Sequence, residues 1–386
     1  MPQSYRSEDT ELLGLIAALL RDGASAPLDA LGEDAAGRFC ELCAIHGVEA
    51  LAFAALTERP RPGSLAGLLL RRLGPVAQTH AALGLASTAS LTRLLDLFAE
   101  ADVPVLLLKG AALAHTLYPR PYLRARGDLD LLVPEARRGA ADRLLTAAGY
   151  VRQDSMREAG SRQVSYRPPD QDLAGELIDL HWSITDARLL HGLLAPEVLL
   201  AASVPVPALG PHARAPHRLH AMLHACMHRA ANFSTRFRAA GAWHLEPDRL
   251  IWLYDIHLLS QGFDTDDWEW LCDMAADLGL RALCLDALEA SARRFGSPVP
   301  ARVRERLGAG PPEPSAGYLR PGLLHKLIVE VGAQRHWRGR LQVASSYALP
   351  PAEFLRDKYP ERRRWPLPAL YGLHLARGVL RLLGLR

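Results

Sequence analysis

Strand-like patterns are confined to the middle of this chain, between residues 103 and 182, and helical patterns fill most of the rest. Before residue 100 and again after residue 187, apolar residues recur at the spacing that gives a helix one apolar face. Residues 104–108 and 128–133 instead form short apolar runs, which are typical of buried strands. We therefore expect an α+β fold with one small mixed β-sheet, flanked by N-terminal and C-terminal helical regions.

Breaks in the pattern divide the 386 residues into four expected segments. Proline and glycine clusters mark these breaks, because neither residue continues a helix well. The expected segments are an N-terminal helical region (1–100), a core that carries the strands (101–185), a C-terminal helical domain (186–307), and a linker with a helical tail (308–386).

Several elements within these segments are defined sharply enough to be checked. Residues 60–63 (Pro-Arg-Pro-Gly) and 24–33 are expected to interrupt the first helical region. The clearest later helices are expected over 248–259 and 267–295. An Arg/Leu-rich helix is expected over 367–383, at the end of the tail.

Composition excludes several classes of protein. Hydrophobic residues make up 49% of the chain and charged residues 23%, as in ordinary globular proteins. This excludes collagen-like, coiled-coil and wholly disordered chains. The net charge of +3 is small for this length, so we do not expect a nucleic acid as partner.

The cysteines and the N-terminus indicate a cytoplasmic, reduced protein. Five cysteines are an odd number and too sparse for a disulfide framework. Cys40 and Cys43 have helical spacing, with no second pair at a zinc spacing. The N-terminus lacks the pattern of a secretory signal, and no apolar stretch reaches the roughly 18 to 20 residues of a membrane span.

Two aspartates alternate with leucine at the start of the second strand-like run. In Asp128-Leu129-Asp130 both carboxylates point to one side of a strand, while Leu129 points to the other. Two such carboxylates on a buried strand repel each other and lose hydration. A divalent cation removes this cost, and carboxylates suit Mg²⁺, which also shares phosphate oxygens.

A third aspartate lies in another strand-like run. Asp179 is followed two residues later by His181, which faces the same way. If the two strands are neighbours, three carboxylates converge. That is enough to hold two metal ions about 4 Å apart for an in-line phosphoryl or nucleotidyl displacement.

Lys109 and Gly110 stand at the end of the first strand-like run. A glycine at a strand-to-helix turn lets backbone amides approach phosphates, and the following helix starts with its positive end toward them. Lys109 adds a mobile charge, although a lysine that only caps a strand end explains it equally well. Arg124 and Arg126 precede the aspartates and are placed to contact phosphates.

The stretch from Val105 to Tyr150 resembles the bacterial nucleotidyltransferase-like family of the DNA polymerase beta superfamily. The resemblance spans roughly residues 85–260. The residues that carry it are Lys109, Gly110, Tyr118, Pro119, Arg124, Gly127, Asp128 and Asp130, the run Asp179 to Trp182, and the downstream His224, His228, Trp252 and Asp255.

The resemblance implies a polymerase beta-like core in which Asp128 and Asp130 bind metal. Asp179 would be a third metal ligand or the base that activates an acceptor. Two Mg²⁺ ions and an NTP donor are implied, and Lys109, Gly110, Arg124 and Gly127 would bind the nucleotide. Lys-Gly replaces the superfamily's usual Gly-Ser turn, so that Lys109 would supply a charge in place of the serine hydroxyl.

Two further features have simpler explanations. His220, His224 and His228 share one face of an expected helix, and packing and hydrogen bonds beside the nucleotide explain them better than a metal does. Residues 361–364 (Glu-Arg-Arg-Arg) form a basic cluster that would suit RNA or an anionic lipid surface. A solvated run of charges is the simpler interpretation.

Two hypotheses of different classes follow. The main one is an Mg²⁺-dependent nucleotidyltransferase that moves a nucleoside monophosphate from an NTP to a small molecule, a peptide or a protein. The alternative is a catalytically inactive nucleotide-binding or scaffolding protein on the same fold. The sequence selects no acceptor, base or oligomeric state.

Overall fold

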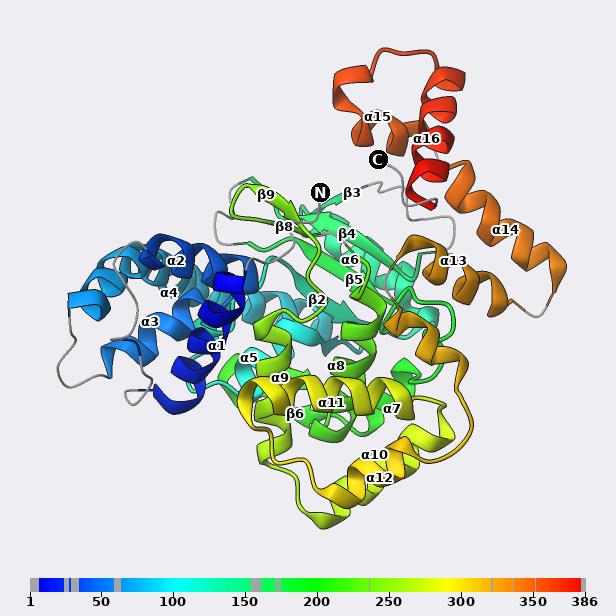
Figure 1. The fold of residues 1–386 in the computed structure, drawn as a ribbon. Helices are drawn as coiled ribbons and strands as arrows, with labels where there is room; N and C mark the ends of the chain where they lie inside the picture. The colour runs from blue at the N-terminus through cyan, green and yellow to red at the C-terminus, as the bar shows by residue number, and fades with distance from the viewer. Residues whose placement is uncertain are drawn as a thin grey trace.

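Five strands from the middle of the chain form one mixed sheet, with helices from both ends of the chain packed around it (Figure 1). The spatial order is β1-β2-β5-β4-β3; β2 and β5 are parallel, and the other neighbours are antiparallel. The expected α+β class with a small mixed sheet is confirmed. The strands are β1 (Leu106–Leu107), β2 (Leu129–Leu132), β3 (Val151–Gln153), β4 (Gln163–Arg167) and β5 (Ile178–His181).

This computed structural model describes most of the chain. The expected break at 60–63 lies outside the described residues, as does the break at 24–33 except for Leu28. The described residues are 7–23, 28, 35–58, 64–153, 161–170, 172, 175–235, 237–320, 322–334, 336–350 and 352–382.

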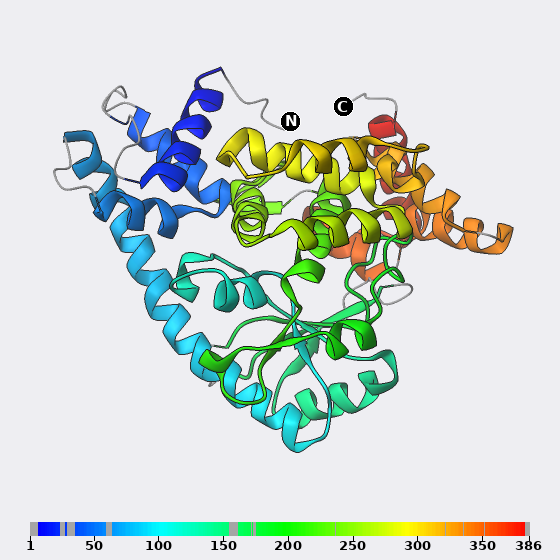
Figure 2. The same ribbon diagram turned by 90° about the horizontal axis from the view of Figure 1, so that it is seen from below.

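One face of the sheet is covered by the long helix α4, which Figure 2 shows in cyan along one side of the molecule. Leu91, Leu94 and Phe98 of α4 share a core with Leu107 of β1 and Leu129 of β2. Helix α6 adds two further side chains, Ala141 and Leu145, to this core. The helices on this face are α4 (Ser64–Glu100) and α6 (Arg138–Ala147). Helices α1 (Ser7–Asp22), α2 (Ala35–His46) and α3 (Glu49–Thr57) pack in a separate core with the first part of α4.

The other face of the sheet is covered by helices that follow it in sequence and by α5. Leu106 and Leu132 point this way and pack in one core with Met222 and Leu223 of α8. Because side chains alternate along a strand, Asp130 faces the same way as Leu132. The helices are α5 (Lys109–Thr116), α7 (Pro196–Ala201), α8 (Arg218–Asn232), α9 (Leu250–Gln261), α10 (Thr265–Asp277), α11 (Arg281–Phe295) and α12 (Ala301–Gly308).

The helix expected over 267–295 is in fact two helices, α10 and α11. Gly279 separates them with a φ of +65°, a left-handed conformation that commonly ends a helix at glycine. The amide of Leu280 then donates to the carbonyl of Ala275 at 2.7 Å. The turn lets α10 and α11 pack against each other within one core.

The last part of the chain forms a helical arm that projects from the rest of the molecule (Figure 1). The expected linker contains a 3₁₀ helix, Pro314–Leu319, whose Tyr318 is buried. The expected tail helix is present as α16. None of the described helices combines the length and apolar character needed to cross a membrane. The arm consists of α13 (Leu323–Gly332), α14 (Trp337–Ala348), α15 (Ala352–Lys358) and α16 (Leu367–Leu382).

Candidate active site

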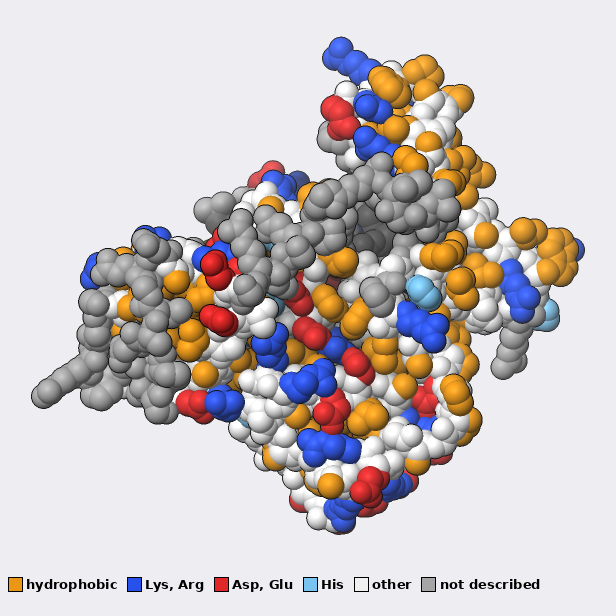
Figure 3. Space-filling view, in the orientation of Figure 1, with side chains coloured by type: hydrophobic (Ala, Val, Ile, Leu, Met, Phe, Trp, Pro, Cys, Tyr) orange, Lys and Arg blue, Asp and Glu red, His pale blue; other side chains and the backbone are white. Residues whose placement is uncertain are grey.

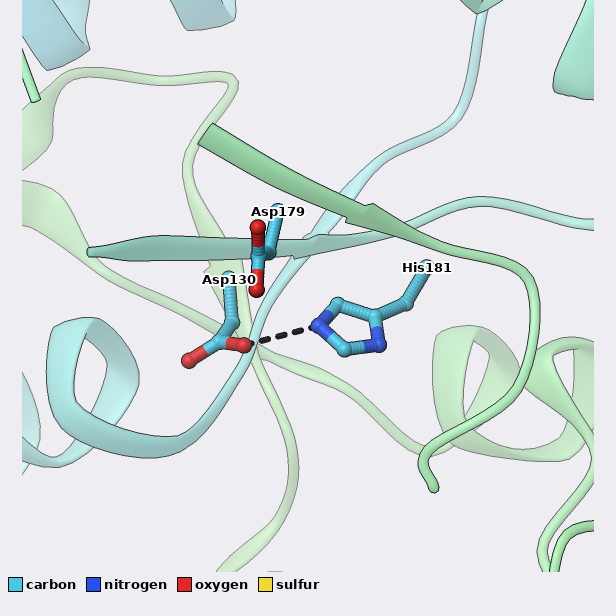
Figure 4. Close-up of side chains that lie close together, drawn as sticks. All are labelled: Asp130, Asp179 and His181. Atoms are coloured by element: carbon cyan, nitrogen blue, oxygen red, sulfur yellow. Dashed lines mark hydrogen bonds and ion pairs between the residues drawn. The ribbon is translucent and has the colours of Figure 1, made fainter. Parts of the chain in front are cut away.

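The register of β2 and β5 brings acidic residues together. The strands are parallel neighbours in which Asp130 pairs with Asp179 and Leu132 pairs with His181. Paired residues of parallel strands point to the same face, so the carboxylates of Asp130 and Asp179 lie side by side, with His181 next to them (Figure 4). The expectation that the strands of Asp130 and Asp179 are neighbours is therefore confirmed.

Asp130 is a buried carboxylate with two basic partners. Its Oδ1 accepts a hydrogen bond from Lys109 Nζ at 2.5 Å and lies 2.7 Å from His181 Nε2. Burial alone would raise the pKa of Asp130, but the Lys109 ammonium and the bond to His181 outweigh it and hold that pKa below its ordinary value. Asp130 is thus kept ionised by the Lys109 ammonium and the bond to His181.

Asp179 is oriented from the neighbouring strand β4. Ser165 Oγ donates to Asp179 Oδ1 at 2.5 Å, and Gln163 Nε2 donates to Oδ2 at 2.8 Å. Each carboxylate oxygen can accept a further bond or ligate a cation. The two donors therefore fix the carboxylate without blocking it.

Asp128 lies just before β2 and is half-buried. Burial raises its pKa to about 6, the Asp130 carboxylate adds to this effect, and the Lys109 ammonium opposes it. Within the described part of the chain, Asp128 accepts no hydrogen bond and forms no ion pair. Its charge is the one in this group that a cation would relieve most.

The arrangement is compatible with a divalent metal ion. Asp130, Asp179 and His181 each offer one ligand atom, and these atoms lie within 4.8 Å of one another. This group differs from the expected ligands Asp128, Asp130 and Asp179, because it includes His181 and does not include Asp128, which lies just before β2. The alternation Asp179-Leu180-His181 indicated that Asp179 and His181 share a face, but His181 was not expected as a ligand.

Lys109 adopts an unusual backbone conformation at the end of β1. Its φ is +46°, which L-residues other than glycine, asparagine and aspartate seldom adopt. Gly110, the second residue of α5, is buried, and a Cβ there would lie 3.2 Å from Arg124 Nη1 and 3.3 Å from Arg126 Cβ. The glycine thus lets the loop before β2 approach the start of α5.

Arg124 is committed to a partner that the sequence did not reveal. Its Nε and Nη2 donate to both carboxylate oxygens of Asp255 on α9, at 2.7 to 3.1 Å. Tyr118 Oη also donates to Asp255, at 2.7 Å. This buried network ties the loop before β2 to α9. Gly127 is exposed, and a Cβ there would meet nothing within 4 Å.

A small pocket of about 40 Å³ lies beside Lys109 between α5, α8 and α9. Its lining includes Arg124, His224, His228 and Trp252. Burial and, second, the nearby Lys109 ammonium lower the pKa of His224 to about 3 and that of His228 well below its ordinary value. Both imidazoles are therefore neutral at pH 7.

The histidines of α8 take part in packing and hydrogen bonding. His224 Nε2 lies 3.1 Å from the carbonyl of Ile184, His228 packs edge-on against Trp252, and His220 does so against Trp270. No histidine of α8 belongs to the metal-compatible group found among the described residues.

Comparison with known families decides the classification. A model described as an uncharacterised nucleotidyltransferase matches residues 33–296, more than half of the chain. The chain belongs to this family. The match begins before α2 and ends just after α11, so the family's region includes helices on both sides of the sheet and leaves the helical arm outside. No curated protein matches the chain.

Proposed function

We propose that this protein is an Mg²⁺-dependent nucleotidyltransferase that transfers a nucleoside monophosphate from an NTP to an acceptor hydroxyl. The observation that carries the proposal is the parallel register of β2 and β5, which sets Asp130 beside Asp179 in a metal-compatible group. Membership of the nucleotidyltransferase family supports the reaction class.

In this proposal Asp128, Asp130 and Asp179 hold two Mg²⁺ ions, and His181 supports Asp130. When bound, the cations neutralise charge on the triphosphate. Lys109 and the N-terminus of α5 at Gly110 add positive charge for the same group. Arg124, fixed by Asp255, and Gly127 complete the nucleotide-binding side.

The acceptor oxygen attacks the α-phosphorus, and the bond from that phosphorus to the pyrophosphate oxygen breaks. The hydroxyl proton passes to Asp179, whose orientation is set by Ser165 and Gln163. The rate gain comes from positioning and charge stabilisation, as in other phosphoryl transfers.

In this proposal the small pocket beside Lys109 forms one wall of the nucleoside site. Trp252 contributes an aromatic ring to the lining, and the neutral imidazoles of His224 and His228 contribute uncharged nitrogens that can form hydrogen bonds. A neutral, partly aromatic wall suits a base. NTPs are cytoplasmic metabolites, so we place the reaction in the cytoplasm, with a small molecule, a peptide or a protein as acceptor and no nucleic acid.

The test uses NTPs labelled in turn on the α- and γ-phosphorus, incubated with a metabolite and peptide extract. Nucleotidyl transfer moves the α-label into product and the γ-label into pyrophosphate. The variant Asp128→Asn/Asp130→Asn is expected to abolish transfer, while Asp273→Asn, an exposed carboxylate on α10, serves as control. Unchanged turnover in a folded Asp128→Asn variant would refute the assignment.

The same experiment distinguishes nucleotidyl transfer from other reactions and from nucleotide binding without reaction. Transfer of the γ-label would indicate a kinase. Tight, metal-dependent NTP binding without transfer to any fraction would favour a nucleotide-binding scaffold on this fold.

A further inference from the structure

The helical arm, residues 322–382, differs in charge from the rest of the molecule. Residues 322–386 hold 12 Lys or Arg and four Asp or Glu, a net charge of +8. The whole chain has a net charge of +3, so residues 1–321 carry −5. The basic charge of this protein is therefore concentrated in the arm, outside the family's region.

The basic side chains of the arm are available to a partner. Arg338, Arg340, Arg363 and Arg364 are exposed, and none of the four forms an ion pair within the described part of the chain. Arg338 instead lies over the ring of Trp337, and Arg362 lies over that of Trp365. Guanidinium groups without a carboxylate partner favour an anionic surface.

Helix α16 presents an apolar face to solvent. Its inner side packs on α15 through the buried Leu370. Its outer side exposes Gly372, Leu375, Ala376, Val379 and Leu380, which recur at three- and four-residue intervals and so form one stripe. Val379 is 53% exposed and Leu375 is 42% exposed.

Helices α13 and α14 extend this apolar surface. Ile328 of α13 is 59% exposed, and Trp337 and Leu341, one turn apart on α14, are 67% and 58% exposed. Figure 3 shows hydrophobic side chains along the outer edge of the arm and Lys and Arg side chains at its tip. The apolar surface therefore runs along the arm beside the basic charge.

The arm is fixed to the rest of the molecule at its base. Glu330 of α13 is buried, accepts from Tyr318 Oη at 2.6 Å, and pairs with Arg188 at 3.7 Å. Farther out, the core that the structure describes in the arm holds Leu355, Tyr359 and Leu370, with a few partly buried neighbours. The base is thus anchored while the outer helices turn apolar side chains away from the protein.

We propose that this arm docks the protein on an anionic phospholipid surface. Helices with aliphatic and tryptophan side chains beside arginines lie in the interface of a bilayer, held by apolar burial and by attraction to anionic headgroups. A nucleic acid fits less well, since Leu341, Leu375, Val379 and Leu380 have no ring to stack on bases. A second arm would be repelled, because residues 322–382 of each copy carry a net charge of +7.

The test measures flotation of the full-length protein with vesicles of phosphatidylcholine, with and without phosphatidylglycerol. Binding is expected only to the phosphatidylglycerol vesicles and is expected to weaken with salt. Arg363→Gln/Arg364→Gln should lower the affinity by about tenfold or more, from roughly 1 kcal/mol per arginine near the surface. The matched control, Arg71→Gln/Arg72→Gln, changes an exposed pair on α4 and should bind as the parent does.

The apolar contribution has its own pair of variants. Leu341→Ser/Leu375→Ser should reduce vesicle binding strongly, whereas Leu83→Ser/Leu85→Ser, two leucines of α4 that are 53% and 72% exposed, should not. Circular dichroism confirms that each variant is folded, and NTP binding should be unchanged in all four.

Absence of vesicle binding by the folded parent protein at low salt would overturn the proposal. So would an equal loss of binding in the arm and control variants. Retention on single-stranded RNA, or concentration-dependent self-association, without vesicle binding would also overturn it and would assign the arm to that other partner.

Discussion

Lys109 is the residue on which the charge of the site depends. Its ammonium lies on the Asp130 carboxylate, next to Asp128 and Asp179. Burial would lower the pKa of Lys109, but these three carboxylates outweigh burial and raise it. Without a bound metal, one lysine thus offsets the repulsion within an acidic cluster.

Lys109→Met should therefore destabilise the metal-free protein by about 3 kcal/mol, because it removes the cationic partner of the buried Asp130 carboxylate and leaves that carboxylate with His181 alone. Urea unfolding in EDTA measures this loss. Added Mg²⁺ should narrow the difference from the parent, and Lys109→Arg, which keeps the charge, should recover part of the stability. Equal stability of Lys109→Met and the parent in EDTA would contradict this account.

His46 predicts a pH dependence away from the site. It is buried at the end of α2, and its Nδ1 accepts from the amide of Leu250 on α9 at 3.0 Å. Burial, with Arg249 nearby, lowers its pKa from 6.5 to about 3. In the unfolded chain His46 therefore binds a proton near pH 6.5, whereas in the folded chain it does so only near pH 3. The free energy of unfolding consequently falls as the pH drops from about 6.5 to about 3.

The variant His46→Asn keeps an acceptor for Leu250 but does not titrate. The pH slope of its unfolding free energy between pH 6 and 4 should be smaller than the parent's by up to about 1.4 kcal/mol per pH unit. Urea unfolding across this range checks it, with the exposed His212→Asn as control. Parallel pH profiles for His46→Asn and the parent would disprove the prediction.

At the scale of elements, the Arg124–Asp255 pair joins the loop before β2 to α9. Both side chains are buried, so removing one partner leaves a charge without compensation. Asp255→Asn and Arg124→Met should each cost about 3 kcal/mol, and the double variant should cost less than their sum by about 2 kcal/mol. A double-mutant cycle in urea measures this coupling, and additive losses would show that the pair does not hold the two elements together.

Elements with local patterns were predictable from the sequence. The alternation at Asp128 to Leu131 predicted a strand here, because side-chain direction follows from a period of two. The strand β2 begins at Leu129, so Asp130 lies in it and Asp128 just before it. The helix break at Gly279 was missed, since apolar spacing continues through it and only the left-handed φ of one glycine separates α10 from α11.

Partners far apart in sequence were not predictable. Arg124 and Asp255 are 131 residues apart, and the ligand group includes His181 because of a strand register. No local pattern encodes either contact. The resemblance indicated which residues matter, but the structure was needed to show that Arg124 faces a carboxylate and that Lys109 covers Asp130. The expected domain boundaries and the roles of the site residues stay predictions.

At the scale of the whole molecule, cores of different size predict regions of different stability. Three large clusters hold the sheet and the helices of the family's region, whereas the cluster described at the end of the arm is a small one around Leu355, Tyr359 and Leu370. Local opening requires less free energy where fewer apolar contacts are broken.

Amides of α15 and α16 should therefore exchange with solvent hydrogen well before those of α9 and α11. Leu370→Ala should remove most of the protection in α15 and α16, since it deletes part of a small core at a cost of about 2–4 kcal/mol. Protection in α9 and α11 should not change. Equal loss in both regions would show that the arm and the body unfold as one unit.

The most direct test of the central claim is calorimetric titration of each NTP, with and without Mg²⁺, into the parent and the Asp128→Asn/Asp130→Asn variant. We expect the parent to bind at least one NTP only with Mg²⁺ and the folded variant to bind none. Folded parent protein that binds no NTP in the presence of Mg²⁺, or a variant that binds as the parent does, would contradict the account.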